Sequence, residues 1–127
     1  MATGLENLKI YQMAKKLELE VFKLLKSFPK EECFRSVDQL SHSSSSVTNN
    51  IAEAYNKKSI KDKTRILNDI VKGEANETRS NLEVCIEKGF HSEKSLINGY
   101  TELLMALSGY IRFLRNSETQ TSKLTNL

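Results

Sequence analysis

The stretch from Ser36 to Tyr55 reads SVDQLSHSSSSVTNNIAEAY, and its spacing decides how the rest of the chain is interpreted. It looks like a serine-rich linker. Yet its apolar and small residues recur in alternating steps of 3 and 4, at Val37, Leu40, Ser44, Val47, Ile51 and Ala54. That is the spacing of one helix face, which a flexible linker has no reason to keep. We therefore predict a central helix from Ser36 to about Asn56, whose small side chains let neighbouring helices approach closely.

A first helix is predicted before this stretch. Thr3 and Glu6 form a T-x-x-E capping box, so the helix should begin at about Gly4, and Pro29 should end it. Its core-facing residues step by 4 and 3 in alternation: Ile10, Ala14, Leu17, Val21, Leu24 and Phe28. Such a stripe is typical of a helix that packs against a core.

Capping signals also mark the other helix starts. Ser36 begins an S-x-x-Q box at the central helix, and Ser59 begins an S-x-x-D box at a third helix that ends near Lys88, with Gly89 as its cap. Ser92 is expected to cap a fourth helix. The third helix carries one apolar stripe, Leu67, Val71, Ala75, Thr78, Leu82 and Cys85, and beside it a second row that we also expect to face inward, Ile66, Ile70, Gly73, Glu77, Asn81 and Val84. A glycine inside a helix costs about 1 kcal/mol relative to alanine, so the second row suggests a close backbone approach at Gly73.

The fourth helix has the clearest period, with Leu96, Tyr100, Leu103, Leu107, Tyr110 and Leu114 in steps of 4 and 3. Short links force consecutive helices to lie antiparallel. The prediction is therefore an all-α, antiparallel up-down-up-down four-helix bundle over residues 1–116. Residues 117–127 have no period and are expected to form a frayed or disordered tail.

Composition limits the class of protein. The 127 residues are enough for one core of ordinary size, and the formal net charge of +3 permits an anionic partner without demanding one. Cys33 and Cys85 lack ligand spacing, so we interpret them as free thiols of a reducing compartment. No stretch has the length of a signal peptide or a membrane span, so we expect a cytoplasmic protein with no membrane partner.

The sequence lacks the patterns of a metal or nucleophile site, although helix bundles often house such sites. A di-iron carboxylate site needs Glu-x-x-His on two helices, but Gln39 stands three residues before His42, and Lys88 three before His91. His42 precedes the run Ser43 to Ser46, but neighbours on a helix point about 100° apart, and no nucleophile elbow or glycine loop is present. We interpret His42 as a half-exposed helix residue, and we predict a protein without catalytic residues, metal or cofactor.

Two polar groups remain as candidate sites. The first, Gln39, Asn50, Glu53 and Glu77, falls close to the inward rows, and buried carboxylates must be paired or hydrogen-bonded. We interpret it as a structural polar layer that fixes the register of the bundle, with a small-ligand or ion site as the alternative.

The second group is a basic cluster at the turn between the central and third helices: Lys57, Lys58, Lys61, Lys63 and Arg65. Cations at the start of a helix are disfavoured by its dipole, so a site that keeps them can attract phosphate. The alternative is a solvated, solubilising corner. No aromatic residues are interleaved, so contact with nucleic acid would be made mainly to its backbone and would be sensitive to salt.

Several of these residues resemble a bacterial four-helix-bundle family named for a protein encoded within intervening sequences of large-subunit ribosomal RNA genes. The likeness runs from about Leu8 to Tyr110, and Asn50-Ile51-Ala52-Glu53 after a spaced Phe28-Pro29 is its most specific part. The other matching positions are Glu32, Phe34, Gln39-Leu40, Ser46-Val47, Arg65, Leu67, Gly73, Glu77, Leu82 and Gly89-Phe90.

The resemblance implies a non-enzymatic, ribosomal-protein-like bundle that assembles as a ring-shaped homopentamer. A related branch, the accessory protein of diversity-generating retroelements, works with a reverse transcriptase and its RNA. This chain departs from the family pattern at Ser41 and His42, which replace two arginines, at Thr48, which replaces a proline, and at Ala54, which replaces a glycine. Loss of the arginines removes two phosphate-binding groups from the central helix.

Two functions follow as hypotheses. The first is a small oligomeric module that binds RNA or a ribonucleoprotein through the basic turn. The second is a protein–protein adaptor or scaffold, suggested by a face of small residues on the central helix: Ser41, Ser45, Thr48 and Ala52.

Overall fold

Helices make up the ordered elements of the computed structural model, which describes residues 4–125, and no strand occurs in that range. The elements follow one another as η1 (Leu5–Asn7), α1 (Lys9–Leu25), η2 (Lys30–Glu32), η3 (Cys33–Val37), α2 (Asp38–Asn56), α3 (Ile60–Arg65), η4 (Ile66–Val71), α4 (Lys72–Glu87) and α5 (Lys94–Thr125). Two of them, η1 and η2, are 3₁₀ turns, whereas η3 and η4 are π-helical. The predicted all-α class is confirmed.

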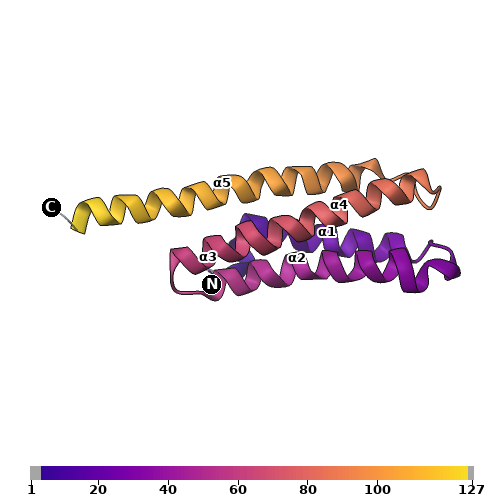
Figure 1. The fold of residues 1–127 in the computed structure, drawn as a ribbon, viewed down its shortest axis with the longest axis horizontal. Helices are drawn as coiled ribbons and strands as arrows, with labels where there is room; N and C mark the ends of the chain where they lie inside the picture. Colours follow the sequence, from indigo (N-terminus) through magenta and orange to yellow (C-terminus); the bar gives the residue numbers. More distant parts are fainter. Residues whose placement is uncertain (1–3, 126–127) are drawn as a thin grey trace.

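These elements join into four helical rods in the described part of the chain. The segments η2, η3 and α2 run on without a break, as do α3, η4 and α4. Figure 1 shows each rod returning alongside the one before it, with links at alternate ends of the molecule. Helix α1 packs against α2 and α5, and α4 packs against the same two helices. This path is the one that the predicted antiparallel bundle requires.

The core fills the interior between the rods and comes mainly from the predicted stripes. The buried side chains include Ile10, Ala14, Leu17 and Val21 of α1, Leu40, Val47, Ile51 and Ala54 of α2, Leu67 and Val71 of η4, Ala75, Leu82 and Cys85 of α4, and Leu96, Tyr100, Leu103, Leu107, Ile111 and Leu114 of α5. Apolar side chains that leave water contribute about 25 cal/mol per Å². Burial of these stripes is therefore the main force that holds the rods together.

The second inward row predicted on the third helix is mostly wrong. Ile66 is buried, but Ile70, Gly73, Glu77 and Val84 are exposed. The neighbours α2 and α5 cover one arc of this rod, and a single stripe already fills that arc. A Cβ on Gly73 would meet nothing within 4 Å, so the predicted close approach there is wrong as well.

Helix α1 begins at Lys9 rather than at Gly4. Residues Leu5–Asn7 form a 3₁₀ turn, and Leu8 is extended, with ψ 117°, which interrupts the helical path. Gln12 Nε2 donates a hydrogen bond of 2.6 Å to the carbonyl oxygen of Glu6, which ties this turn to the helix. Thr3 of the predicted capping box lies outside the described residues.

Helical backbone before α2 begins earlier than predicted, directly after Pro29. Proline suits this position because it has no N–H to leave unpaired. Ser36 is therefore inside the rod, and the prediction that it caps the helix is wrong. Its hydroxyl donates instead to Glu32 Oε2 at 2.8 Å, and this bond is the main reason that the pKa of Glu32 lies below its ordinary value.

Both predicted ends of the third rod are confirmed. The Ser59 hydroxyl accepts the backbone N–H of Asp62 at 3.0 Å, as an N-cap does. At the other end Gly89 has φ 82°, its N–H donates to Ile86 O, and the N–H of Phe90 donates to Cys85 O, each at 2.9 Å. That pair of bonds is the Schellman motif, which needs the left-handed conformation that glycine adopts freely.

Helix α5 begins at Lys94, two residues after the predicted cap Ser92. The backbone N–H of Glu93 donates to His91 Nδ1 at 3.0 Å, so His91 rather than Ser92 satisfies an amide here. A neutral imidazole that accepts at Nδ1 carries its proton on Nε2, which lies 2.9 Å from Leu82 O. The ring also stacks on Phe28, with centroids 5.9 Å apart, and so fixes the link between α4 and α5.

The backbone of α5 is helical as far as Thr125. The sequence led us to expect a frayed or disordered tail from Ser117, but the helical backbone extends beyond that boundary. The division into a bundle of residues 1–116 and a tail of residues 117–127 stays a prediction.

Both cysteines are free, with Cys33 exposed and Cys85 buried in the core. None of the helices in the described range is both long enough and apolar enough to cross a membrane.

Candidate nucleic-acid interface

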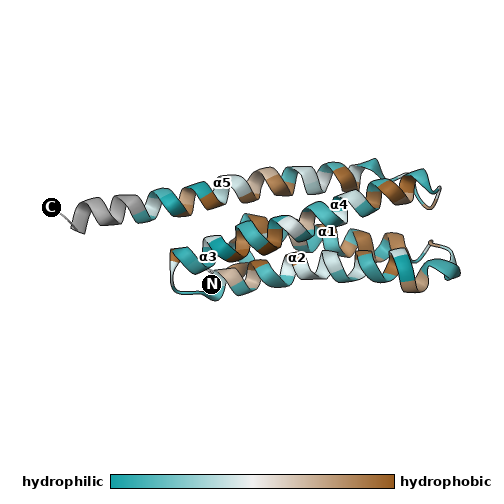
Figure 2. Cartoon of the chain, in the orientation of Figure 1, coloured by the Kyte–Doolittle hydropathy of each residue, from teal (hydrophilic) through white to brown (hydrophobic). Residues whose placement is uncertain are grey.

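The predicted basic residues surround the tight link between α2 and α3. Lys57 and Ser59 both have extended backbone, with ψ 149° and 145°, and the chain turns back between them. This link is hydrophilic throughout in Figure 2, whereas α2 is pale along its serine run. The turn places the end of one rod beside the start of the next, so cations from both come to one end of the bundle.

Lys63 is turned toward the bundle and is not available to a ligand. Its Nζ donates to the carbonyl oxygen of Tyr55 at 2.7 Å and lies 5.4 Å from the centroid of the Tyr55 ring. The carbonyl is one of the unpaired groups at the end of α2, where a cation also complements the helix dipole. Lys63 therefore stabilises the turn, and its place in the predicted binding group is not supported.

Lys57 is partly engaged as well. Its Nζ lies 3.9 Å from Glu53 Oε1, and both side chains are about half exposed. An exposed pair of this kind contributes about 0–1 kcal/mol and is screened by salt. Glu53 therefore offsets part of the positive charge of Lys57 without fixing it.

Lys58, Lys61 and Arg65 are the exposed cations of the group. Lys61 and Arg65 are four residues apart and so project from the same side of the rod. Asp62 is the acid nearest to them in sequence, and among the described side chains no ion pair within 4.0 Å joins its carboxylate to any of the three. These three cations form what we call the basic corner, and they can approach a phosphate without first breaking an internal bond.

The predicted polar layer does not exist in this bundle. Gln39, Glu53 and Glu77 are exposed, and Asn50 is half-buried. Asn50 Nδ2 donates to the carbonyl oxygen and to Oγ of Ser46, at 2.9 and 3.0 Å, within its own helix. Periodicity placed these four side chains close to the inward rows, but the structure leaves none of them in the core.

A different polar pair is buried between α2 and α4. The hydroxyls of Ser43 and Thr78 are hydrogen-bonded at 2.7 Å, and both side chains are almost fully buried. Thr78 Oγ1 also donates to the carbonyl oxygen of Glu74 at 2.8 Å. The signal was present in the sequence, because Thr78 is the one hydroxyl in an apolar stripe, but spacing did not identify its partner in the serine run.

The small-residue face that suggested an adaptor is partly covered. Ser41 is exposed, Ser45 and Ala52 are half-buried, and Thr48 is buried and donates to Ser44 O at 3.4 Å. His42 is exposed. In the described part of the chain no three His, Cys, Asp or Glu side chains lie close enough together to hold a metal ion.

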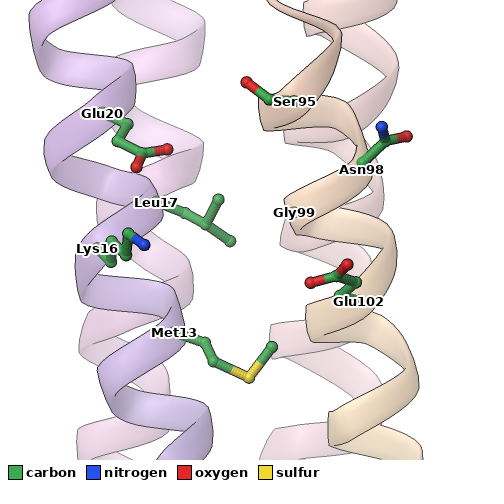
Figure 3. A pocket seen from close by; sticks show the side chains of 8 residues that line it. All are labelled: Met13, Lys16, Leu17, Glu20, Ser95, Asn98, Gly99 and Glu102. Atoms are coloured by element: carbon green, nitrogen blue, oxygen red, sulfur yellow. The ribbon is translucent and has the colours of Figure 1, made fainter.

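A mixed-charge groove runs between α1 and α5, with a volume of about 450 Å³. Figure 3 shows Met13 and Leu17 of α1 pointing toward α5, while Glu102 of α5 points back toward α1. Lys16, Glu20 and Asn98 also line the groove. Gly99 stands opposite Leu17, and a Cβ at that position would lie 2.5 Å from Leu17 Cδ2. The close backbone approach expected at Gly73 therefore occurs at Gly99.

Both the sequence and the fold are similar to those of known proteins. Residues 6–109 match the model of a family described as the 23S rRNA-intervening sequence protein. A solved structure from Bacteroides thetaiotaomicron VPI-5482, of a protein with unknown function from the S23 ribosomal protein family, is 27% identical to the chain, with a TM-score of 0.73. The match covers 80% of this chain and 97% of that one. No curated protein matches the chain.

Proposed function

Because the chain belongs to the 23S rRNA-intervening sequence protein family, we propose that it is a non-enzymatic up-down-up-down bundle that binds RNA or a ribonucleoprotein. The contact is made by the basic corner, Lys58, Lys61 and Arg65. Neither the family description nor that of the similar structure names an enzymatic activity. The two free cysteines support a place in the reducing cytoplasm.

The observation that supports RNA binding is that one cation at the turn stabilises the fold while three others are exposed. Lys63 serves the fold through Tyr55 O, whereas Lys58, Lys61 and Arg65 are exposed. The positive end of the helix dipole repels cations near the start of a helix. An anion bound between these cations relieves that repulsion, which is unrelieved in the free protein. Phosphates of a nucleic-acid backbone supply that anion, and their counterions are released on binding.

Binding is tested by fluorescence anisotropy with a labelled RNA hairpin over a series of salt concentrations. The triple variant Lys58→Gln, Lys61→Gln and Arg65→Gln brings the formal net charge from +3 to zero. Each phosphate contact adds about 0.7–0.9 to the slope of log K against log salt, so the variant should lose about two to three units of slope.

A matched control removes the same charge at the opposite end of the bundle. Lys30, Arg35 and Lys94 are exposed and lie by the links between α1 and α2 and between α4 and α5. Their replacement by glutamine should leave the slope close to that of the wild type. Equal losses in both triple variants would mean that net charge, and not the basic corner, governs binding.

We also propose that the protein is a homo-oligomer, and the sequence resemblance implies a pentamer. Large apolar side chains on the outside of the bundle support this: Met105 is 71% and Phe113 62% exposed on α5, and Phe22 is 59% exposed on α1. Assembly of the protein would remove these side chains from water. Light scattering after gel filtration at micromolar concentration is the test, and a strictly monomeric result would exclude the ring.

The alternative function is a protein–protein adaptor that uses these same apolar side chains. It predicts that Met105→Ser with Phe113→Ser abolishes capture of the host partner while RNA binding is absent from the wild type. Binding of RNA that depends on the basic corner would exclude an adaptor without nucleic-acid contact.

A further inference from the structure

A second basic surface lies between the start of α4 and the C-terminal half of α5. It is a groove of about 280 Å³ over the buried side chain of Ile111. Its polar lining comes from both walls: Asn68, Lys72, Ser108, Arg112, Arg115 and Asn116. None of these residues belongs to the groups that sequence spacing singled out.

The lining carries three cations and no carboxylate. The nearest acid in sequence, Asp69, is exposed, and its Oδ1 accepts a hydrogen bond of 3.3 Å from Asn68 Nδ2. Among the side chains that the structure describes, the ion pair within 4.0 Å is Lys57–Glu53, so Lys72 and Arg112 have no carboxylate partner there. Like charges on two facing helices repel each other, and an anion between them removes that repulsion.

The donors suit a phosphate group. Arg112 presents a planar fork of N–H groups that matches two phosphate oxygens, and Lys72 adds a mobile point charge from the other wall. The amide of Asn116 and the hydroxyl of Ser108 can donate to the remaining oxygens. A volume of about 280 Å³ holds roughly nine waters at about 30 Å³ each, so a phosphate fits with part of its hydration shell.

The groove continues the basic corner. Lys61, Arg65, Asn68 and Lys72 follow one another in steps of 4, 3 and 4 along the third rod, and both α3 and η4 pack against α5. The intervening segment η4 is π-helical, a form that occurs often at functional sites. An RNA strand that crosses the basic corner therefore reaches the groove along one side of the molecule.

We infer that Lys72 and Arg112 bind a phosphate group of the RNA backbone in this groove, beyond the phosphates bound at the basic corner. The inference rests on the proposed function and extends its contact surface from the turn onto α5. It also makes a separate statement, that an isolated phosphate ion binds between these two side chains.

The experiment uses the full chain and two readouts. Anisotropy with the RNA hairpin compares the wild type, the groove variant Lys72→Gln with Arg112→Gln, and a control, Lys30→Gln with Arg35→Gln, which loses the same two charges at the far end. The groove variant should lose about one to two units of salt slope, and the control should lose none. In NMR spectra of the wild type titrated with inorganic phosphate, the Arg112 Nε–H signal should shift and saturate.

The outcomes separate the two proposals. A groove variant with the slope of the wild type, together with a loss in the basic-corner variant, would overturn the groove and leave the proposed function standing. Phosphate saturation at Arg112 without RNA binding would leave only the binding of an isolated phosphate ion standing and would overturn both the RNA contact of the groove and the proposed function. Absence of both signals would overturn both proposals. The charge-conserving variant Lys72→Arg with Arg112→Lys should keep most of the salt slope. A loss in the glutamine variant alone would then be due to the missing charges and not to substitution at these two positions as such.

Discussion

Replacement of Gly99 by alanine measures how closely α1 and α5 approach. Two effects of similar size oppose each other at this position. Alanine is favoured over glycine in a helix by about 0.8–1 kcal/mol, which stabilises the variant. The new Cβ would lie 2.5 Å from Leu17 Cδ2, and overpacking of this kind costs about 1–3 kcal/mol.

The second effect should balance or exceed the first, because Leu17 is buried and relief of the clash requires its side chain to turn out of the core toward the groove of about 450 Å³ that it lines. We expect Gly99→Ala to lower the free energy of unfolding by about 0–2 kcal/mol. Gly109 on the same helix is the matched control, because a Cβ there would meet nothing within 4 Å. Gly109→Ala should raise the free energy of unfolding by about 1 kcal/mol.

Urea denaturation followed by far-UV circular dichroism measures both variants, at one fixed protein concentration because the chain is proposed to oligomerise. The two free energies should differ by about 1–3 kcal/mol, or roughly 3–10 °C in Tm for a chain of this size. In a Leu17→Ala background the clash is absent, so Gly99→Ala should become stabilising by about 1 kcal/mol. Equal stabilisation by Gly99→Ala and Gly109→Ala in the wild type would refute the close approach.

Three further predictions concern buried or paired polar groups. Thr78→Val should cost about 1–3 kcal/mol because it leaves the Ser43 hydroxyl buried without its partner, and Ser43→Ala added to it should recover most of that loss in urea titrations. Tyr100→Phe should be neutral or stabilising, because the buried Tyr100 hydroxyl has no hydrogen-bond partner in the described part of the chain. Burial raises the pKa of Tyr100, so its contribution to stability is complete below about pH 10 and is lost as pH rises further; the phenylalanine variant should lose less stability in alkaline melts than the wild type. The Ser36 hydroxyl lowers the pKa of Glu32, so this hydrogen bond contributes stability above the unfolded pKa of about 4.3, and the contribution is lost as pH falls. Ser36→Ala should therefore raise the pKa of Glu32 in an NMR titration. An unchanged pKa would contradict the role of the hydrogen bond.

Helix faces could be predicted from the sequence because burial follows the period of the backbone. The stripe from Leu67 to Cys85 is buried in full, and the local signals at Ser59 and Gly89 act as predicted, since each concerns residues within one or two turns. The start of the second rod, at η2, was not predicted, because S-x-x-Q looks like a cap wherever it occurs, whereas the helical backbone in fact begins after Pro29.

Long-range pairing could not be predicted in the same way. Gly73 and Gly99 look alike in sequence, and the side chain that distinguishes them, Leu17, comes from the first helix. Likewise, Lys61 and Lys63 differ by only two positions, but the location of Tyr55 across the turn draws one of them inward. The groove around Lys72 and Arg112 depends on which sides of the third rod and α5 face each other. The order of charges along the sequence does not specify how two helices are rotated relative to one another.

The unequal burial of the two cysteines allows the opening of the bundle to be measured with the protein's own thiols. Cys33 is exposed, so a thiol reagent should modify it at the rate of a free cysteine, while Cys85 is 2% exposed and must wait for α4 to leave the core. When closing is faster than modification, the ratio of the two rates reports the equilibrium population of the open form. One molecule therefore carries both the reporter and its internal reference, and no second variant is needed to measure what fraction of the protein has its core open.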